Sequence, residues 1–353
     1  MATAIQHLMV IGLLASALGI LFGWAFRHLP REQWQVFGVI PVCKDRDGSW
    51  QGLNLTYYGV INGCAVAGAL SVAFVLLAAV GMSTPAIGCT LGGVLLLVAP
   101  SAKWVARLVE KKRHTLTIGG ASFFGLVGTP LLLWLLQPAV SRWTSVELPL
   151  LPIISAMAIG YALGEGIGRL ACLSFGCCYG KPIEEFGPFL RYLSTPFHVV
   201  FHGATKKAAY AGGLDGRPLL AIQSITSVLS TMSALAGVYL YLEGHFESAY
   251  LVCLLVTQTW RIVSEFARAD YRGAGHISAY QYMAAIAALV GVVYAMVLPA
   301  VPFQVDLVRG LRALWDPAVI IGGQFVWIGV FLFTGRSRTT AARLSLFVRT
   351  DRI

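Results

Sequence analysis

The segment with the clearest chemical potential runs Gly168-Arg-Leu-Ala-Cys-Leu-Ser-Phe-Gly-Cys-Cys-Tyr-Gly-Lys181. It sets Arg169, Cys172, Cys177 and Cys178 at the end of an apolar stretch. A charged side chain in a bilayer is costly and usually marks a working site, and glycines let a ligand approach the backbone closely. Thiols become nucleophiles beside a cation, which Arg169 supplies locally. The segment therefore predicts a site that combines a guanidinium with thiol chemistry.

The three cysteines leave several interpretations open. Adjacent cysteines such as Cys177 and Cys178 rarely close an unstrained disulfide. A zinc site would need a fourth ligand and a more regular Cys-x-x-Cys spacing, so we expect no metal, and we expect no cofactor. Packing by at least one of the three thiols is as compatible with the sequence as chemistry.

A second charged segment ends another apolar window, at Gln258-Thr-Trp-Arg-Ile-Val-Ser-Glu-Phe-Ala-Arg268. Arg261, Glu265 and Arg268 share one helical face because they are spaced four and three residues apart. One interpretation is that Arg261 binds a phosphate group bidentately while Glu265 orients it. The alternative is an internal Arg–Glu pair that fixes helix packing, with Arg268 and Asp270 at the membrane interface.

Other polar residues give weaker signals. His198 and His202 are four residues apart, but solvated loop histidines explain them better than a base or a ligand pair. His114 sits in a basic cluster and indicates the membrane interface. Gln223 begins an apolar window and could donate a hydrogen bond into the site.

The composition places these segments in a membrane. Of the 353 residues, 57% are hydrophobic and 12% are charged, and the mean hydropathy is +0.73. Soluble domains carry about 25% charged residues, so the chain is a polytopic membrane protein. The net charge of +10 then indicates contact with anionic lipid or a phosphate-bearing substrate, not nucleic-acid binding.

Nine windows are long and apolar enough to span a bilayer, and they predict an all-α fold of about nine transmembrane helices around a seven-helix core. The windows are 8–26, 57–80, 85–105, 116–137, 150–171, 218–242, 246–266, 278–298 and 316–335. We divide the chain into an additional N-terminal helix with a polar loop (1–54), a core (55–298) with an extramembrane arm (179–217) that carries an interfacial helical turn, and an additional C-terminal helix with a basic tail (299–353).

The basic residues predict the orientation. Lysine and arginine concentrate in 27–56, 101–116, 168–217, 267–277 and the tail, which nine helices place on one side of the membrane. The opposite loops hold Arg142, Arg309 and Arg312. The positive-inside rule puts the basic side in the cytosol. No lysine or arginine precedes the first apolar window, so we expect a retained helix with its N-terminus outside and not a secretory signal.

At this point the motifs resemble a known family, the bacterial prolipoprotein diacylglyceryl transferases. Residues 168–181 match in length and register its signature Gly-Arg-x-Gly-Asn-Phe-x-Asn-x-Glu-x-x-Gly-Arg, and 261–268 resembles its Arg-x-x-x-Glu-Phe-x-Arg helix end. The segment 119–128 is similar to its Gly-Gly-x-Ser-Phe-His-Gly-Gly stretch, and Tyr57-Tyr58-Gly59 to its early Tyr-Gly helix. The resemblance covers about residues 55 to 298.

The resemblance implies that Arg169 and Arg261 hold the phosphate of a phosphatidylglycerol-like lipid and that Glu265 carries over. This sequence departs from the family pattern at three positions. Phe124, Cys172 and Cys177 stand where the family has a histidine, an asparagine and a glutamate, respectively. The acid–base groups therefore differ, and the chain resembles a cysteine-bearing paralogue. The residues expected to line the substrate are Tyr58, Phe124, Gly168, Gly176, Gly180, Gln223 and Arg268.

The resulting hypothesis is an integral-membrane transferase of a bacterial inner membrane. It would move a diacylglyceryl group from a phospholipid to an unknown acceptor, with a thiol as one candidate. Cys177 would act as nucleophile or line the pocket. Two alternatives stay open, which are a membrane thiol-redox protein using Cys172, Cys177 and Cys178, and a lipid-binding or transport module without catalysis.

Overall fold

A computed structural model describes residues 2–109, 118–144, 148–270, 277–299 and 302–353. The long helices are α1 (Ala2–His28), α2 (Tyr57–Ala79), α3 (Thr84–Val109), α4 (Ile118–Thr144), α5 (Leu150–Phe175), α8 (Ile222–Leu242), α9 (Phe246–Phe266), α10 (Ala279–Val297) and α12 (Pro317–Thr334). The short helices are α6 (Pro188–Ser194), α7 (Lys207–Tyr210) and α11 (Leu307–Ala313), with single 3-10 turns at Glu32–Trp34, Ile183–Glu185 and Thr350–Arg352.

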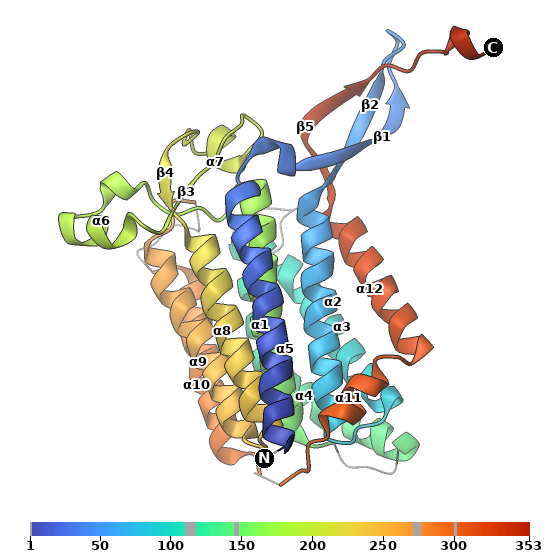
Figure 1. Ribbon diagram of the computed structural model, residues 1–353, viewed down its shortest axis with the longest axis vertical. Helices are drawn as coiled ribbons and strands as arrows, with labels where there is room; N and C mark the ends of the chain where they lie inside the picture. The colour runs from blue at the N-terminus through green and yellow to red at the C-terminus, as the bar shows by residue number, and fades with distance from the viewer. Residues whose placement is uncertain (1, 110–117, 145–147, 271–276, 300–301) are drawn as a thin grey trace.

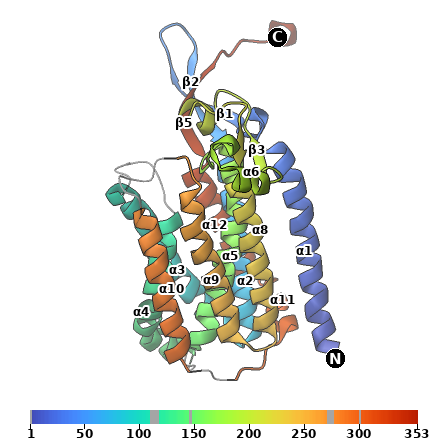
Figure 2. The ribbon, with the colours of Figure 1, turned by 90° about the vertical axis from the view of Figure 1, so that its left-hand side faces the viewer.

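The predicted helical membrane bundle is confirmed. Within the described residues, eight helices are long and apolar enough to cross a membrane. The ninth expected window is α9, which falls outside this group because Glu247, Arg261 and Glu265 interrupt its apolar residues. It nevertheless lies in the bundle between α8 and α10 (Figure 2).

Helix α5 is the centre of the bundle, and it packs against α2, α8 and α9. In its apolar window 72% of the residues are buried, compared with 17% for α1 and 0% for α12. Small residues permit this close packing, as they do between other membrane helices. A Cβ on Gly160 would lie 2.8 Å from the carbonyl oxygen of Ala69 on α2.

The described helices alternate in direction, so that the N-terminus lies at one end of the bundle and the C-terminus at the other (Figure 1). The polar arm and both small sheets lie at the C-terminal end. The basic segments 27–56, 168–217 and 335–353 meet at this end, as the loop count requires. Residues 110–117 and 271–276, which hold the rest of two basic segments, lie outside the described residues.

Two small antiparallel sheets form outside the bundle, in segments where we predicted no strand. The first has the order β1-β2-β5 and the second pairs β3 with β4. Their bounds are β1 (Val36–Lys44), β2 (Trp50–Thr56), β5 (Arg336–Leu344), β3 (His198–Val200) and β4 (Pro218–Leu220). The pairing of β2 with β5 joins the polar loop before α2 to the basic tail after α12 (Figure 1).

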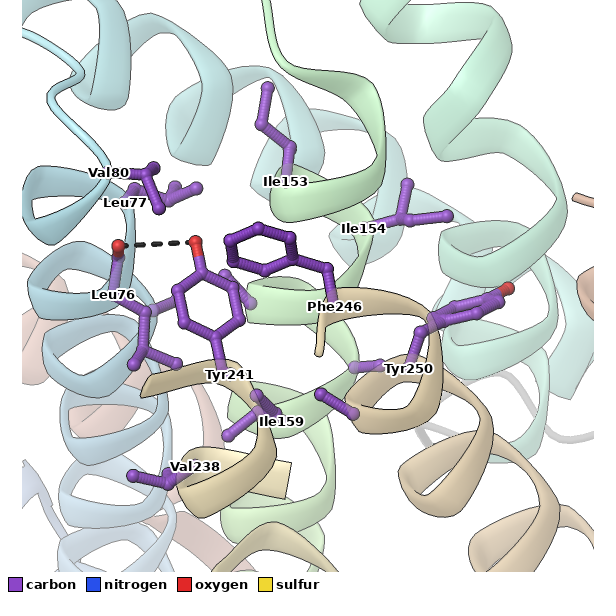
Figure 3. Close-up of a cluster of buried hydrophobic side chains, with 14 of the residues drawn as sticks. Leu76, Leu77, Val80, Ile153, Ile154, Ile159, Val238, Tyr241, Phe246 and Tyr250 are labelled. Carbon is purple, nitrogen blue, oxygen red and sulfur yellow. Dashed lines mark hydrogen bonds between the residues drawn. The ribbon is translucent and has the colours of Figure 1, made fainter. Parts of the chain in front are cut away.

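The end of the bundle opposite the arm is closed by apolar packing. Tyr241 of α8 donates a hydrogen bond to the carbonyl oxygen of Leu76 on α2 at 3.2 Å, and its ring meets that of Phe246 edge to face (Figure 3). Ile153 and Ile159 of α5 surround these rings (Figure 3). Apolar side chains thus fill this end of the bundle, and the charged side chains of α5 lie toward its other end.

Candidate active site

Arg169 and Arg261 converge on one carboxylate, although they are far apart in the sequence. Arg169 of α5 donates from Nη2 to Oε1 of Glu165 at 2.9 Å, and Arg261 of α9 donates from Nη2 to the same oxygen at 2.7 Å. The exposed fractions of the three side chains are 9%, 10% and 3% for Arg169, Arg261 and Glu165. The two guanidinium groups therefore share one buried ion-pair network.

Tyr161 closes this network. Its hydroxyl donates to Oε2 of Glu165 at 2.7 Å and accepts a hydrogen bond from Nη2 of Arg261 at 2.6 Å. Tyr161, Glu165 and Arg169 follow one another at four-residue steps, so they lie on one face of α5. Because α9 packs along this face, Arg261 reaches the same carboxylate from the neighbouring helix.

The network has one excess positive charge and two incompletely bonded cations. Two guanidinium groups face one carboxylate, and the buried Nε atoms of Arg169 and Arg261 have no hydrogen-bond partner among the described residues. An unsatisfied buried donor costs about 1–3 kcal/mol. A phosphate group supplies negative charge and acceptor oxygens, so it would satisfy both deficits.

Helix α4 brings a glycine against this network. A Cβ on Gly119 would lie 3.1 Å from Nη1 of Arg261 and clash with the ring of Tyr280. Gly119 thus leaves room for the guanidinium of Arg261, whereas Gly120 lies against Val105 of α3. Phe124, one turn further along α4, packs its ring on Trp104 and Phe123.

A second charged group follows α9. Arg268 donates to both carboxylate oxygens of Asp270 at 2.9 and 3.1 Å, and its Nη1 lies 3.8 Å from Oε2 of Glu265. Glu265 also interacts electrostatically with Arg261. Arg261 also pairs directly with Glu165, so both carboxylates act on this guanidinium.

The three cysteines of the signature segment form a cluster. The sulfur atoms of Cys172, Cys177 and Cys178 all lie within 4.8 Å of one another, with Cys172 buried and the other two half-buried. Helix α5 ends at Gly176, whose φ of 70° is left-handed, and Cys178 also has a left-handed φ of 57°. These two turns bring the loop back over Cys172.

The loop after the cluster is fixed by backbone hydrogen bonds to the end of α9. The backbone amide of Lys181 donates to the carbonyl oxygen of Ala267 at 2.9 Å, and that of Ala269 donates to the carbonyl oxygen of Tyr179 at 3.1 Å. Gly180 is needed here because a Cβ would collide with the carbonyl oxygen of Leu220. The thiol cluster and the charged groups of α9 are therefore held in one unit.

The other residues expected at the site lie at different distances from the thiol cluster and the end of α9. Gln223 of α8 donates from Nε2 to the carbonyl oxygen of Cys177 at 2.8 Å. Tyr58 of α2 lies near the three thiols and packs on the Phe175 ring. Gly168 is buried on α5, where a Cβ would make ordinary contact with Ala65. His198 and His202 are exposed in the arm, as expected for solvated loop residues.

Glu165 and Tyr161 complete the arginine network but were not among the residues expected at the site. A signal was present, because Glu165 is a single carboxylate within an apolar window and lies four residues before Arg169. Charged groups inside a membrane segment pair with one another. The spacing therefore predicts this ion pair.

The arm is attached to the bundle by a completely buried lysine, Lys206. Its Nζ donates to the carbonyl oxygen of Leu29 after α1 at 3.0 Å and to that of Ser174 in α5 at 2.5 Å. Burial lowers the pKa of Lys206 to about 7, and the Glu32 carboxylate opposes part of this shift. Lys206 thus connects α1, α5 and the arm beside the thiol cluster.

Comparison with known proteins gives two related matches. A family model described as prolipoprotein diacylglyceryl transferase matches residues 49–297. Two proteins from Dehalococcoides mccartyi, strains BAV1 and CBDB1, are named phosphatidylglycerol–prolipoprotein diacylglyceryl transferase. Each is 29% identical to this chain over 153 residues, which is 43% of this chain and 51% of the relative. The alignment thus spans about half the length of these relatives.

Proposed function

Because this chain belongs to the prolipoprotein diacylglyceryl transferase family, we propose that it transfers a diacylglyceryl group from a phosphatidylglycerol-like lipid to an acceptor. The convergence of Arg169 and Arg261 on Glu165 is the observation that carries this proposal. The two arginines come from different helices, and together they carry one charge more than Glu165. The buried Nε–H of each has no hydrogen-bond partner in the part of the chain that the structure describes. These features suit a lipid phosphate.

The arginines would act on the leaving group. In the transfer, the acceptor attacks the terminal glyceryl carbon, the bond from that carbon to the phosphate oxygen breaks, and glycerol phosphate leaves with the electron pair. Negative charge grows on the phosphate as this bond breaks. Two fixed guanidinium groups in a water-poor site stabilise that charge more than they stabilise the bound lipid. Glu165 and Tyr161 act as positioning residues, because they hold both guanidinium groups.

The acceptor chemistry differs from that of the family signature. Phe124 stands where the signature has a histidine, and Cys177 where it has a glutamate. A base that removes the acceptor proton must therefore come from elsewhere. The identities of the acceptor and of the lipid head group are accordingly the most specific parts of this proposal.

The proposal is tested by replacing each arginine and following release of glycerol phosphate from labelled phosphatidylglycerol in lipid vesicles. We expect Arg169→Ala and Arg261→Ala to reduce turnover at least about a hundredfold, because each removes a charged group from the transition state. Arg217→Ala is the matched control, since this exposed arginine pairs with Glu184 in the arm. Full turnover by both site variants would reject the assignment.

The same assay separates the two alternative functions. Lipid that co-purifies with the wild-type protein, without release of glycerol phosphate in the presence of thiol acceptors, would indicate a lipid-binding module. Reversible oxidation of the thiol cluster, without lipid turnover, would indicate a redox protein.

We further propose that the protein lies in a bacterial inner membrane with its N-terminus outside and its C-terminus in the cytosol. The support is the distribution of lysine and arginine. The described basic segments gather at the end of the bundle that carries the site and the C-terminus (Figure 1).

A further inference from the structure

We propose that Cys172, Cys177 and Cys178 bind a thiophilic divalent cation of the Zn²⁺ class, with one coordination position open to an acceptor thiol. The metal site stands on the geometry of the cysteines. Its role toward an acceptor rests on the proposed transferase function. From the sequence we expected no metal, because the spacing of the cysteines is irregular. Metal binding, however, depends on the distances between the sulfur atoms in the folded protein and not on their spacing along the chain.

The sulfur positions suit three ligands of one ion. The three atoms lie within 4.8 Å of one another. Tetrahedral zinc with Zn–S bonds of about 2.3 Å requires sulfur atoms about 3.8 Å apart. Small side-chain rotations close this difference. Cys64, Cys89 and Cys253, in contrast, lie on three different helices, α2, α3 and α9.

The backbone around the cluster is built to hold it. Cys178 adopts a left-handed conformation that non-glycine residues rarely occupy. The carbonyl of Cys177 is held by Gln223 from α8, and the following residues are hydrogen-bonded to the end of α9. A disulfide would use two of the three sulfurs at most, whereas a metal site uses all three.

Two arginines lie beside part of the cluster and would offset the charge of a bound thiolate site. Three thiolates and one divalent cation have a net charge of −1. Arg169 interacts electrostatically with Cys172 and Cys178, and Arg268 interacts with Cys178. Cations beside a thiol stabilise its thiolate form, which is the form that binds metal.

An open fourth position would replace the missing base. A cation held by the three cysteines would lower the pKa of an acceptor thiol, whose proton would pass to water. The acceptor thiolate would then attack the glyceryl carbon, the carbon–oxygen bond would break, and glycerol phosphate would leave next to Arg169 with the electron pair. The step needs no redox partner. It also explains how a chain with Phe124 in place of the signature histidine activates a thiol.

The experiment measures metal in the full-length protein, purified in detergent with reductant and dialysed against Zn²⁺ or Co²⁺. We expect one equivalent of metal by mass spectrometry and a sulfur-to-cobalt charge-transfer band in the Co²⁺ form. Cys177→Ser and Cys178→Ser should each lose the band and most of the metal. Cys64→Ser and Cys89→Ser, the same change at exposed cysteines, should retain both.

Two further measurements keep the outcomes distinct. Arg261→Ala should bind metal like the wild type although its lipid turnover is lost. A wild-type protein that binds metal but shows no lipid turnover would reject the transferase and leave the metal site standing. Turnover in a metal-free protein, unchanged by Cys178→Ser, would overturn the metal site and leave the transferase standing. A metal-free wild-type protein with a Cys172–Cys177 disulfide would also overturn it. The wild-type cobalt titration answers the question even where a serine variant misfolds.

Discussion

At the scale of single residues, Glu165 decides how the site is organised. One of its oxygens accepts hydrogen bonds from both arginines, and the other accepts one from Tyr161. A buried carboxylate without cations would be very unfavourable in a membrane, and so would the arginines without it. The three charges therefore stabilise one another.

Glu165→Gln should lower lipid turnover about ten- to hundredfold, because a charge-assisted hydrogen bond contributes about 1.5–3 kcal/mol. The amide keeps the size of the side chain but does not fix two guanidinium groups. The measurement is the initial rate of glycerol phosphate release at saturating lipid. Glu243→Gln is the control, because Glu243 pairs with His7 outside the site. An unchanged rate for Glu165→Gln would remove its positioning role.

At the scale of elements, the loop between α5 and the arm holds the site together. It ends α5 with a left-handed glycine, gathers the thiols and then pairs with the residues after α9. Gly180 forms an isolated bridge with Arg268 in this pairing. The position of the thiol cluster therefore depends on the position of α9.

Gly180→Ala should destabilise this loop by about 1–3 kcal/mol, which is typical of overpacking. The added methyl group would meet the backbone of Leu220 and, at 3.2 Å, the side chain of Ile222. Gly187→Ala is the matched control, because a Cβ there meets nothing within 4 Å. Thermal unfolding in detergent compares the two, and equal melting temperatures would contradict the predicted close contact.

The attachment of the arm by Lys206 should depend on pH. Below a pH of about 7 the lysine is protonated in both the folded and the unfolded state, and the cost of burying its charge is fully present. Between about pH 7 and 10.5 the folded state holds fewer protons than the unfolded state, so stability rises with pH. Limited proteolysis of the arm should therefore slow as pH increases through this range.

Two variants check the origin of this pH dependence. Lys206→Met should remove the slope, because no titrating group remains at that position. Lys207→Met leaves the bonds to Leu29 and Ser174 in place and should keep it. A slope that persists in Lys206→Met would assign the pH dependence to another group.

At the scale of the whole molecule, the described helices place the two termini at opposite ends of the bundle (Figure 1). The site lies nearer the end that carries the C-terminus, the arm and both sheets. The termini at opposite ends and the described basic segments at one end are mutually consistent. The orientation of the whole bundle then follows from which end faces the cytosol.

A C-terminal green fluorescent protein fusion should fluoresce in cells, and an N-terminal epitope tag should be accessible to protease from outside the inner membrane. Both follow from the positive-inside rule. A fusion of the fluorescent protein to the loop after α8, near Gly244, is the internal control and should not fluoresce. The reverse pattern would place the arginine network on the outer half of the membrane.

The sequence by itself determined the spanning windows, because hydrophobic length is a property of local composition. It also identified Arg169, Arg261 and the cysteines, because charges and thiols in an apolar chain stand out from their neighbours. It paired Arg261 with Glu265 because that carboxylate is the nearest along the helix.

Only the tertiary structure decided which of these residues contact one another. Close packing of α5 against α9 brings Glu165 to Arg261 from another helix, and left-handed turns at Gly176 and Cys178 gather three thiols whose spacing is irregular. The strands β2 and β5 pair across most of the chain's length. Such contacts depend on the relative positions of distant segments, which the energetics of short stretches do not fix.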